Sequence, residues 1–151
     1  MQSDKLQREA AKVLEWGKLL EVLASYAQST VGAEHCRSIR LEQDFTQALG
    51  RQQETSDMVL LRAAVDPFPR LQFPHVTEWL GRVAKGACLE VHELRDIALV
   101  LEVIEDVQRY LLRHQDDAPT VSAMVTRFGP VAEYRRLLVA LNAAIDRDGS
   151  M

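Results

Sequence analysis

"VHELRDIALVLEVIEDVQRYLLRH", residues 91–114, carries the strongest helical pattern in the chain. One apolar stripe, with steps of three and four residues, consists of Leu94, Ile97, Leu101 and Ile104. A second stripe beside it consists of Val100, Val103, Val107 and Tyr110. Apolar residues that recur at these steps share one face of an α-helix, and two adjacent stripes make that face wide. The segment is therefore predicted to be the central helix of the fold.

Two shorter helices are predicted near the N-terminus. Apolar residues at helical spacing run through residues 12–28 and place Leu20 on the apolar side. Ser29 or Thr30 can cap a short second helix, and Glu34 is placed to strengthen its start.

A third helix and an extended connector are predicted before the central helix. Asp44 and Gln47 form a capping box for a helix over residues 45–64. Residues 66–74 read DPFPRLQFP, and three prolines in nine residues favour an extended connector over a helix. The apolar residues of this connector that are predicted to enter the core are Phe68, Leu71 and Phe73.

Short helical segments flank the central helix. Residues 75–86 are predicted to form one of them, with Gly86 as a left-handed cap at its end. Beyond a loop, residues 121–128 and 131–145 are predicted to form two more helices. Gly129-Pro130 separates them, because this dipeptide is typical of a break between elements.

The chain closes with AAIDRDGSM, residues 143–151. Asp148-Gly149 is predicted to be a tight turn, and a turn of this kind needs a return strand that the sequence does not supply. The ending therefore predicts a domain taken from a longer protein and cut just inside a hairpin. A frayed natural C-terminus is the alternative interpretation.

Together these patterns predict an all-α fold, an irregular bundle of six or seven helices with the first strand of a truncated hairpin at its C-terminus. Residues 1–12 are predicted to be a flexible lead-in, and residues 13–151 one helical domain. An apolar content of 47% and a charged content of 26% are ordinary for a soluble globular protein.

The composition restricts the class of protein. The chain contains no apolar run long enough to span a membrane and no secretory signal at its N-terminus. Two cysteines do not make a disulfide framework, so a cytoplasmic protein with free thiols is expected. The net charge of −4 lacks the basic surplus that is typical of a stand-alone nucleic-acid binder.

No catalytic, cofactor-binding or metal-binding residue is predicted in the chain. The nucleophile elbow of hydrolases and the glycine-rich phosphate loops are absent from the sequence. Cys88 with His92 and His35 with Cys36 lack the paired spacing of zinc ligands. Three acidic residues of the central helix are predicted to form a solvated face, namely Glu102, Glu105 and Asp106.

Basic residues cluster as three pairs, which are Arg37 with Arg40, Arg82 with Lys85, and Arg135 with Arg136. Each pair can contact phosphate groups of a nucleic acid. Each can equally be a helix-terminal charge or half of a surface ion pair, for example with Glu78 or Glu133. Both interpretations remain open at this point.

Four stretches in register resemble one family. The first runs from Leu14 to Gly32 and is similar to the opening of the second bacterial MutS paralogue, a branch of the MutS ATPases. Its matching residues are Leu14, Glu15, Leu20, Leu23, Ala24, Tyr26, Ala27, Ser29 and Gly32. Trp16 and Leu19 depart from the pattern, since Phe and Ile are usual there.

The three later stretches have the same order and spacing as in that family. The second consists of Glu54, Thr55 and Ser56. The third consists of Arg82, Gly86, Leu89, Glu93, Leu94 and Ile97. The fourth is the Ile-Asp-x-Asp-Gly of residues 145–149, which in the family begins a short hairpin, with Met151 where Val or Ile is usual.

The resemblance implies that residues 13–151 are the N-terminal helical core, or lever-type, domain of such an ATPase. It implies that ATP and Mg²⁺ bind to the full-length parent and not to this chain, and that any endonuclease activity also belongs to the parent. It also implies that the clamp and ATPase domains of the same chain are its immediate partners. Branched DNA or a stalled ribosome would be bound by the full-length protein, which would form a homodimer through its ATPase domains.

Two functions of different classes follow from the sequence. In the first, the chain is a mechanical segment that couples the ATPase to the DNA clamp in recombination suppression and DNA repair. In the second, it is a stand-alone helical interaction module without catalytic activity. An exposed apolar groove would favour the second function.

Overall fold

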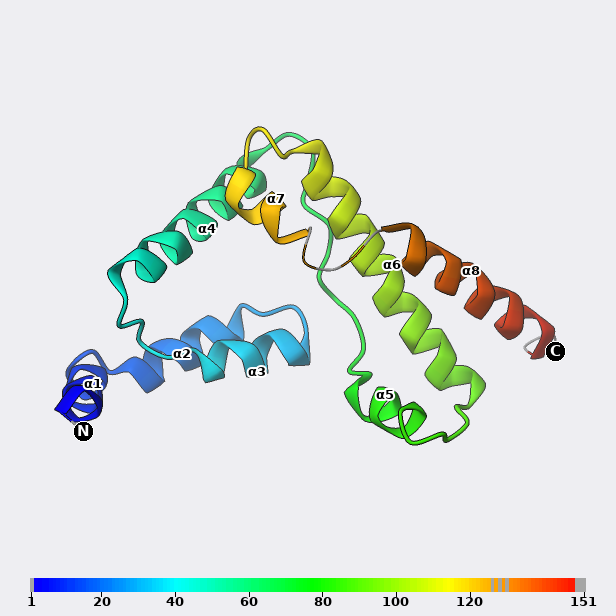
Figure 1. Ribbon diagram of the computed structural model, residues 1–151, viewed down its shortest axis with the longest axis horizontal. Helices are drawn as coiled ribbons and strands as arrows, with labels where there is room; N and C mark the ends of the chain where they lie inside the picture. Colours follow the sequence, from blue (N-terminus) through cyan, green and yellow to red (C-terminus); the bar gives the residue numbers. More distant parts are fainter. Residues whose placement is uncertain (1, 126, 128, 130, 149–151) are drawn as a thin grey trace. The chain divides into compact units, whose positions relative to one another are not determined.

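The computed structural model describes residues 2–125, 127, 129 and 131–148. Within these residues the chain forms eight helices and no strand (Figure 1). The helices are α1 (Gln2–Val13), α2 (Trp16–Ser25), α3 (Thr30–Ser38), α4 (Phe45–Ala63), α5 (Thr77–Val83), α6 (Val91–Arg113), α7 (Pro119–Val125) and α8 (Val131–Asp148). The predicted all-α class is confirmed, whereas the predicted number of six or seven helices is too low.

The chain divides into two compact units, unit 1 (residues 1–48) and unit 2 (residues 49–151). Unit 1 contains α1, α2, α3 and the first residues of α4. Unit 2 contains the rest of α4 and the helices α5 to α8. The domain predicted over residues 13–151 therefore covers parts of both units.

Glu15 separates α1 from α2 in unit 1. Its φ of 48° lies in the left-handed region, which residues other than glycine rarely adopt, and this ends one helix and starts the next. The helix predicted over residues 12–28 therefore begins only at Trp16, and it ends early, at Ser25. Residues 2–12, predicted as a lead-in, are helical. Apolar spacing alone missed the break because the apolar residues continue across it.

Ser29 begins α3, as the sequence predicted. The Ser29 Oγ accepts a hydrogen bond from the Gly32 backbone N–H at 3.1 Å, which satisfies one of the free amides of the first turn. A Cβ at Gly32 would lie 3.1 Å from that oxygen, so this spacing of serine and glycine fits the cap closely. The cap lets α3 lie alongside α2 (Figure 1).

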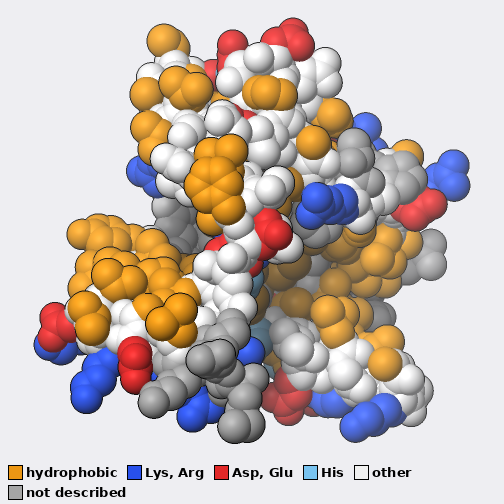
Figure 2. All heavy atoms as spheres, turned by 60° about the vertical axis from the view of Figure 1, so that its left-hand side comes forward, with side chains coloured by type: hydrophobic (Ala, Val, Ile, Leu, Met, Phe, Trp, Pro, Cys, Tyr) orange, Lys and Arg blue, Asp and Glu red, His pale blue; other side chains and the backbone are white. Residues whose placement is uncertain are grey.

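Unit 1 buries few apolar side chains. Among its described apolar residues only Leu20 and Ala24 are buried. Side-chain hydrogen bonds add to the packing, because the Trp16 indole N–H donates to the Ile39 carbonyl at 3.1 Å. Large apolar side chains remain at the surface of the molecule (Figure 2). In this unit the side chain of Tyr26 is 78% exposed.

The start of α4 and the connector after it follow the sequence closely. The Asp44 carboxylate accepts a hydrogen bond from the Gln47 backbone N–H at 2.9 Å, which confirms the predicted cap. Residues 67–76 are extended and run alongside α6 (Figure 1). Phe68 packs against the core and Phe73 is half-buried. Leu71 was also predicted to enter the core, but it is 37% exposed.

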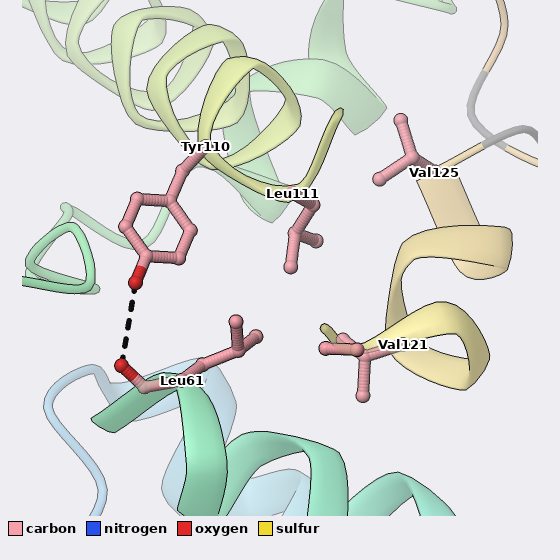
Figure 3. Close-up of a cluster of buried hydrophobic side chains, with 6 residues drawn as sticks. Leu61, Tyr110, Leu111, Val121 and Val125 are labelled. Carbon is pink, nitrogen blue, oxygen red and sulfur yellow. Dashed lines mark hydrogen bonds between the residues drawn. The ribbon is translucent and has the colours of Figure 1, made fainter. Parts of the chain in front are cut away.

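The core of unit 2 joins α4, α6 and α7 (Figure 3). Its buried residues are Leu61, Tyr110, Leu111, Ala118, Val121 and Val125. The Tyr110 hydroxyl lies within 3.3 Å of the Leu61 carbonyl and 2.9 Å of the Asp66 carbonyl, so it can donate to either. Burial raises the pKa of Tyr110, and the nearby Asp66 carboxylate raises it further. The phenol therefore stays protonated and its hydrogen bond stays intact.

The helix α6 is central to unit 2, as its two stripes predicted. It spans Val91–Arg113 and packs against both α7 and α8. Leu101, on the first stripe, is buried, and Leu138 of α8 is half-buried. A 23-residue helix rises about 34 Å at 1.5 Å per residue, and α6 is the longest of the described helices.

The C-terminal strand predicted for the truncated hairpin is wrong for residues 145–148. These residues are the last part of α8, which continues through Asp148. The alanines and Ile145 extend the helical pattern of the preceding residues, and Ile145 is buried in the structure. Gly149, the second residue of the predicted turn, lies outside the described residues.

Candidate functional site

Glu105 connects α6 to α8, although it was predicted to lie on a solvated face. It is only 7% exposed, and its carboxylate accepts hydrogen bonds from Arg109 at 2.6 Å and from Arg135 Nε at 2.9 Å. Arg135 Nη2 donates to the same oxygen. The prediction was wrong because Arg135 is thirty residues away in sequence. Glu102 and Asp106 are exposed, as predicted.

The environment of Glu105 favours its charged form. The hydrogen bond from Arg135 lowers the pKa of Glu105; burial acts in the opposite direction, and Arg109 lowers the pKa further. The net result is a pKa below the ordinary glutamate value. A buried carboxylate held by two guanidinium groups is a rigid connection between two helices, and it offers no proton for catalysis at neutral pH.

Asp57 makes a second buried connection, between α4 and α7. It is 1% exposed, and its carboxylate accepts hydrogen bonds from the backbone N–H groups of Thr120 at 2.8 Å and Val121 at 3.1 Å. The Gln53 side chain donates a third at 3.0 Å. Burial raises the pKa of Asp57, but these hydrogen bonds outweigh it and leave the pKa below its ordinary value.

Glu93 makes a third connection, at the junction of α5 and α6. Its carboxylate accepts a hydrogen bond from the backbone N–H of Glu90 at 2.9 Å and forms an ion pair with Arg82. The Glu90 bond lowers the pKa of Glu93, and Arg82 lowers it further against the effect of burial. In the sequence between Arg82 and Glu93, Gly86 adopts a φ of 83°, which confirms the predicted left-handed cap after α5.

The predicted basic pairs each contain one residue that is bound within the chain. Arg37 Nε lies 3.1 Å from both carboxylate oxygens of Glu21. Arg82 pairs with Glu93 and Arg135 with Glu105, in place of the partners Glu78 and Glu133 considered from the sequence. For these three residues the ion-pair interpretation is the one that the structure supports.

The second residue of each basic pair is exposed. Arg40, Lys85 and Arg136 are all at the surface, and none of them makes an ion pair with the residues that the structure describes. Arg40 lines a shallow groove of about 190 Å³ together with Trp16. Arg40 belongs to unit 1, whereas Lys85 and Arg136 belong to unit 2.

The cysteines and histidines do not assemble a metal centre in the described part of the chain, where no three His, Cys, Asp or Glu residues are placed to hold an ion. His35 and Cys36 lie in unit 1, and Cys88 and His92 lie in unit 2. The His92 ring contacts Trp79 edge-on, with the ring centroids 6.4 Å apart. None of the described helices combines the length and the apolar content that crossing a bilayer requires.

The described residues thus define a helical structural segment in which buried charges join one helix to the next. Comparison with known proteins agrees with the resemblance seen in the sequence. The chain is 25% identical to Endonuclease MutS2 of Exiguobacterium sibiricum over 148 residues, which is 97% of this chain and 19% of that protein. It is 30% identical to Endonuclease MutS2 of Acetivibrio thermocellus over 105 residues, 70% of this chain and 13% of that protein.

A third MutS2, from Symbiobacterium thermophilum, is 23% identical over 146 residues, 97% of this chain and 18% of the relative. The chain is therefore similar to part of the MutS2 proteins, and it spans less than one fifth of the length of these relatives. No family model matches the chain. No solved structure matches it either.

Several residues that carry the resemblance have structural roles. Ser29 and Gly32 form the cap of α3. Arg82, Gly86 and Glu93 form the turn and the ion pair that join α5 to α6. In the described structure these motif residues therefore cap α3 and join α5 to α6.

Proposed function

We propose that this chain is the N-terminal structural core segment of a MutS-family, DNA-dependent ATPase that acts on branched DNA or on stalled ribosomes in the cytoplasm. Its role is mechanical, since it transmits nucleotide-driven motion from the ATPase to the clamp by rigid packing. ATP and Mg²⁺ bind elsewhere in the longer protein, which forms a homodimer through its ATPase domains. The nuclease activity that the relatives' name implies is also assigned to segments outside this chain.

The observation that carries the proposal is the combination of coverage and residue roles. The similarity extends over 97% of this chain but over only 18–19% of two of the relatives. Among the residues that match the family pattern, Ser29 caps α3 and Arg82 forms an ion pair with Glu93. A segment of a larger machine that transmits motion needs fixed helix angles, and these residues fix them.

The connection between α6 and α8 supports a mechanical role in particular. A long helix moves as one piece when its neighbours are bound to it by directional contacts. Glu105 binds Arg109 on its own helix and Arg135 on α8, so that α8 is bound to α6. A displacement of α8 is therefore passed to α6.

The exposed basic residues are the proposed contacts with the phosphate backbone of DNA or ribosomal RNA. Arg40, Lys85 and Arg136 are available for this role, whereas Arg37, Arg82 and Arg135 already bind carboxylates. A few phosphate contacts add affinity without reading sequence, which suits a substrate that is recognised by its shape.

A second candidate function, a stand-alone helical interaction module, is favoured by one observation. Large apolar side chains of unit 1 are exposed on and around α2, including those of Leu14, Leu19, Val22 and Tyr26. An exposed apolar surface of this kind is typical of a protein-binding site. In the first function the chain acts as part of a longer protein, whereas in the second it acts alone and binds a partner protein.

The proposal is tested by replacing the corresponding segment of the Exiguobacterium sibiricum MutS2 with this chain. We expect a folded chimera that hydrolyses ATP and binds a four-way DNA junction, with junction affinity reduced when Arg40, Lys85 and Arg136 are all changed to Ala. As a control, Arg51, Arg62 and Arg70 are changed to Ala together. A chimera that does not fold, while the isolated chain is folded and captures a defined protein partner, would favour the interaction module.

A further inference from the structure

The shallow groove of unit 1 that Arg40 lines is formed by α1, by the start of α2 and by the segment that follows α3. The half-buried apolar residues of its lining are Ala11, Trp16, Ile39 and Leu41. Two exposed cations, Arg8 and Arg40, also belong to the described lining, which includes no acidic residue. The groove therefore places an aromatic ring and an apolar surface beside two guanidinium groups.

The segment that follows α3 is held from two sides. The Trp16 indole N–H donates a hydrogen bond to the Ile39 carbonyl at 3.1 Å, which also fixes the plane of the indole ring. The Gln7 side-chain amide donates to the Leu41 carbonyl at 3.1 Å. Arg40 lies between these two carbonyls, so its backbone is bound to both α1 and α2. A ligand that binds to groups already fixed in place loses less conformational entropy, because they need not be ordered first.

The size of the groove restricts the ligand. Its volume of about 190 Å³ is smaller than the roughly 300 Å³ at which pockets for drug-sized molecules begin. One flat ring fits, while the rest of the ligand lies outside. Guanidinium groups bind phosphate through parallel N–H donors, and aromatic side chains stack on nucleic-acid bases. A positively charged groove with a stacking ring is typical of sites for single-stranded nucleic acids.

We propose that this groove binds one unpaired nucleotide of a nucleic-acid strand. Its base stacks on Trp16, and the phosphates beside it bind to Arg8 and Arg40. The inference rests on the proposed function and deepens it, because branched DNA and ribosomal RNA both contain nucleotides outside a duplex. It requires more than a phosphate contact by Arg40, since a duplex presents phosphates but no free base face. An acidic peptide would satisfy the arginines without using the ring.

The test is an NMR titration of the 151-residue chain with oligothymidylate about ten nucleotides long, which follows the indole N–H signals. We expect the signal of Trp16 and the backbone amide of Arg40 to shift, and the signal of Trp79 in unit 2 to stay in place. A strand of the same length without bases should bind about tenfold more weakly, because it cannot stack on the indole. Oligouridylate is titrated in parallel, and the tighter strand identifies DNA or RNA as the source of the nucleotide.

Variants of the chain separate the roles of the ring and of the charge. Arg40→Gln should weaken binding and reduce the slope of log affinity against log salt concentration by about 0.7, which corresponds to one phosphate contact. The matched control is Arg37→Gln, since Arg37 pairs with Glu21 and is not among the lining residues; it should behave as the unchanged chain. Trp16→Phe keeps an aromatic ring and should bind nearly as well as the unchanged chain, whereas Trp16→Leu should bind about tenfold more weakly. Circular dichroism checks that each variant is folded.

Three results would overturn the inference. The first is an unshifted Trp16 signal. The second is binding of the strand without bases, or of a decaglutamate peptide, as tightly as oligothymidylate. The third is equal affinity of Arg40→Gln and Arg37→Gln.

Failure of this inference differs from failure of the proposed function. Binding that depends on Lys85 and Arg136, with Trp16 unshifted, would overturn the nucleotide site and leave the phosphate contacts of unit 2 standing. A chimera that does not bind a junction, while oligothymidylate still shifts Trp16 in the isolated chain, would instead contradict the proposed function and support the nucleotide site.

Discussion

Asp57 shows how one side chain can fix the position of a whole helix. Its carboxylate holds the first two free amides of α7 while its backbone lies in α4. Asp57 thus caps α7 from a position more than sixty residues away in the sequence. No local sequence pattern indicates that α4 and α7 are joined in this way. The same is true of Glu105, whose partner Arg135 lies on another helix. In both cases a buried carboxylate is stabilised by donors that surround it.

Replacing Asp57 with Asn is expected to lower the free energy of unfolding of unit 2 by roughly 1–3 kcal/mol at pH 7, because the amide is a weaker acceptor for two buried N–H groups. The pKa of Asp57 is lowered on folding, so its contribution is fully present above its unfolded pKa of about 3.8. That contribution is lost as the pH falls through the lower folded value.

The measurement for Asp57 is the melting temperature as a function of pH. The difference between the unchanged chain and Asp57→Asn should be constant near neutral pH and should shrink below about pH 3.8. Asp116→Asn, in an exposed loop, is the matched control and should change little. Parallel curves for the unchanged chain and Asp57→Asn down to low pH would show that the carboxylate has no special role.

Glu105 and Arg135 are expected to act as a coupled pair. Glu105→Gln and Arg135→Met should each lower the melting temperature, and the double variant should lose less than the sum of the two, because each single change leaves the other residue without its partner. The exposed pair of Asp106 and Arg109, 3.4 Å apart, is the comparison and should show little coupling. Additive effects for Glu105 and Arg135 would contradict the connection.

At the scale of the elements, apolar spacing predicted most helices and missed their interruptions. The two stripes of α6 predicted its bounds almost to the residue, since a wide apolar face must be covered. Spacing could not reveal the break at Glu15, because that break depends on a single backbone torsion. It also could not show that α8 continues through Asp148, because a turn signal such as Asp-Gly is weaker than the helical run before it.

The central position of α6 makes a direct prediction about Leu101. Leu101→Asp buries a charge without a partner and is expected to abolish the cooperative unfolding transition of unit 2. Leu99, on the same helix, is 48% exposed, so Leu99→Asp is the control and should retain the transition. Circular dichroism during heating measures both. A normal melt for Leu101→Asp would place the core elsewhere.

At the scale of the whole molecule, the two units differ in how much apolar surface they bury. Unit 2 has a contiguous core, whereas in unit 1 only two described apolar residues are buried. Local stability follows buried contacts, so amides of α2 and α3 are expected to exchange with solvent faster than those of α6. Hydrogen exchange read by mass spectrometry tests this. Equal protection of all three helices would contradict the difference.

Sequence alone indicated the basic residues but could not identify the carboxylates that bind them. It left each of the three basic pairs open between phosphate contact and ion pairing, and the structure shows an ion pair for one residue of each pair. It missed the acceptors Glu21, Glu93 and Glu105, since each belongs to a different element from the arginine it binds. Contacts across elements depend on the packing of the whole unit, which no local pattern encodes.

The measurement that tests the central claim most directly is ATP hydrolysis by the MutS2 chimera that carries this chain, with and without a four-way DNA junction. If the chain transmits motion through α6 and α8, Arg135→Met should leave basal hydrolysis unchanged and reduce its stimulation by the junction. Arg136→Met, the exposed neighbour, should have a smaller effect on stimulation. Unchanged stimulation in Arg135→Met, with the Glu105 connection shown to be broken, would contradict a mechanical role for this segment.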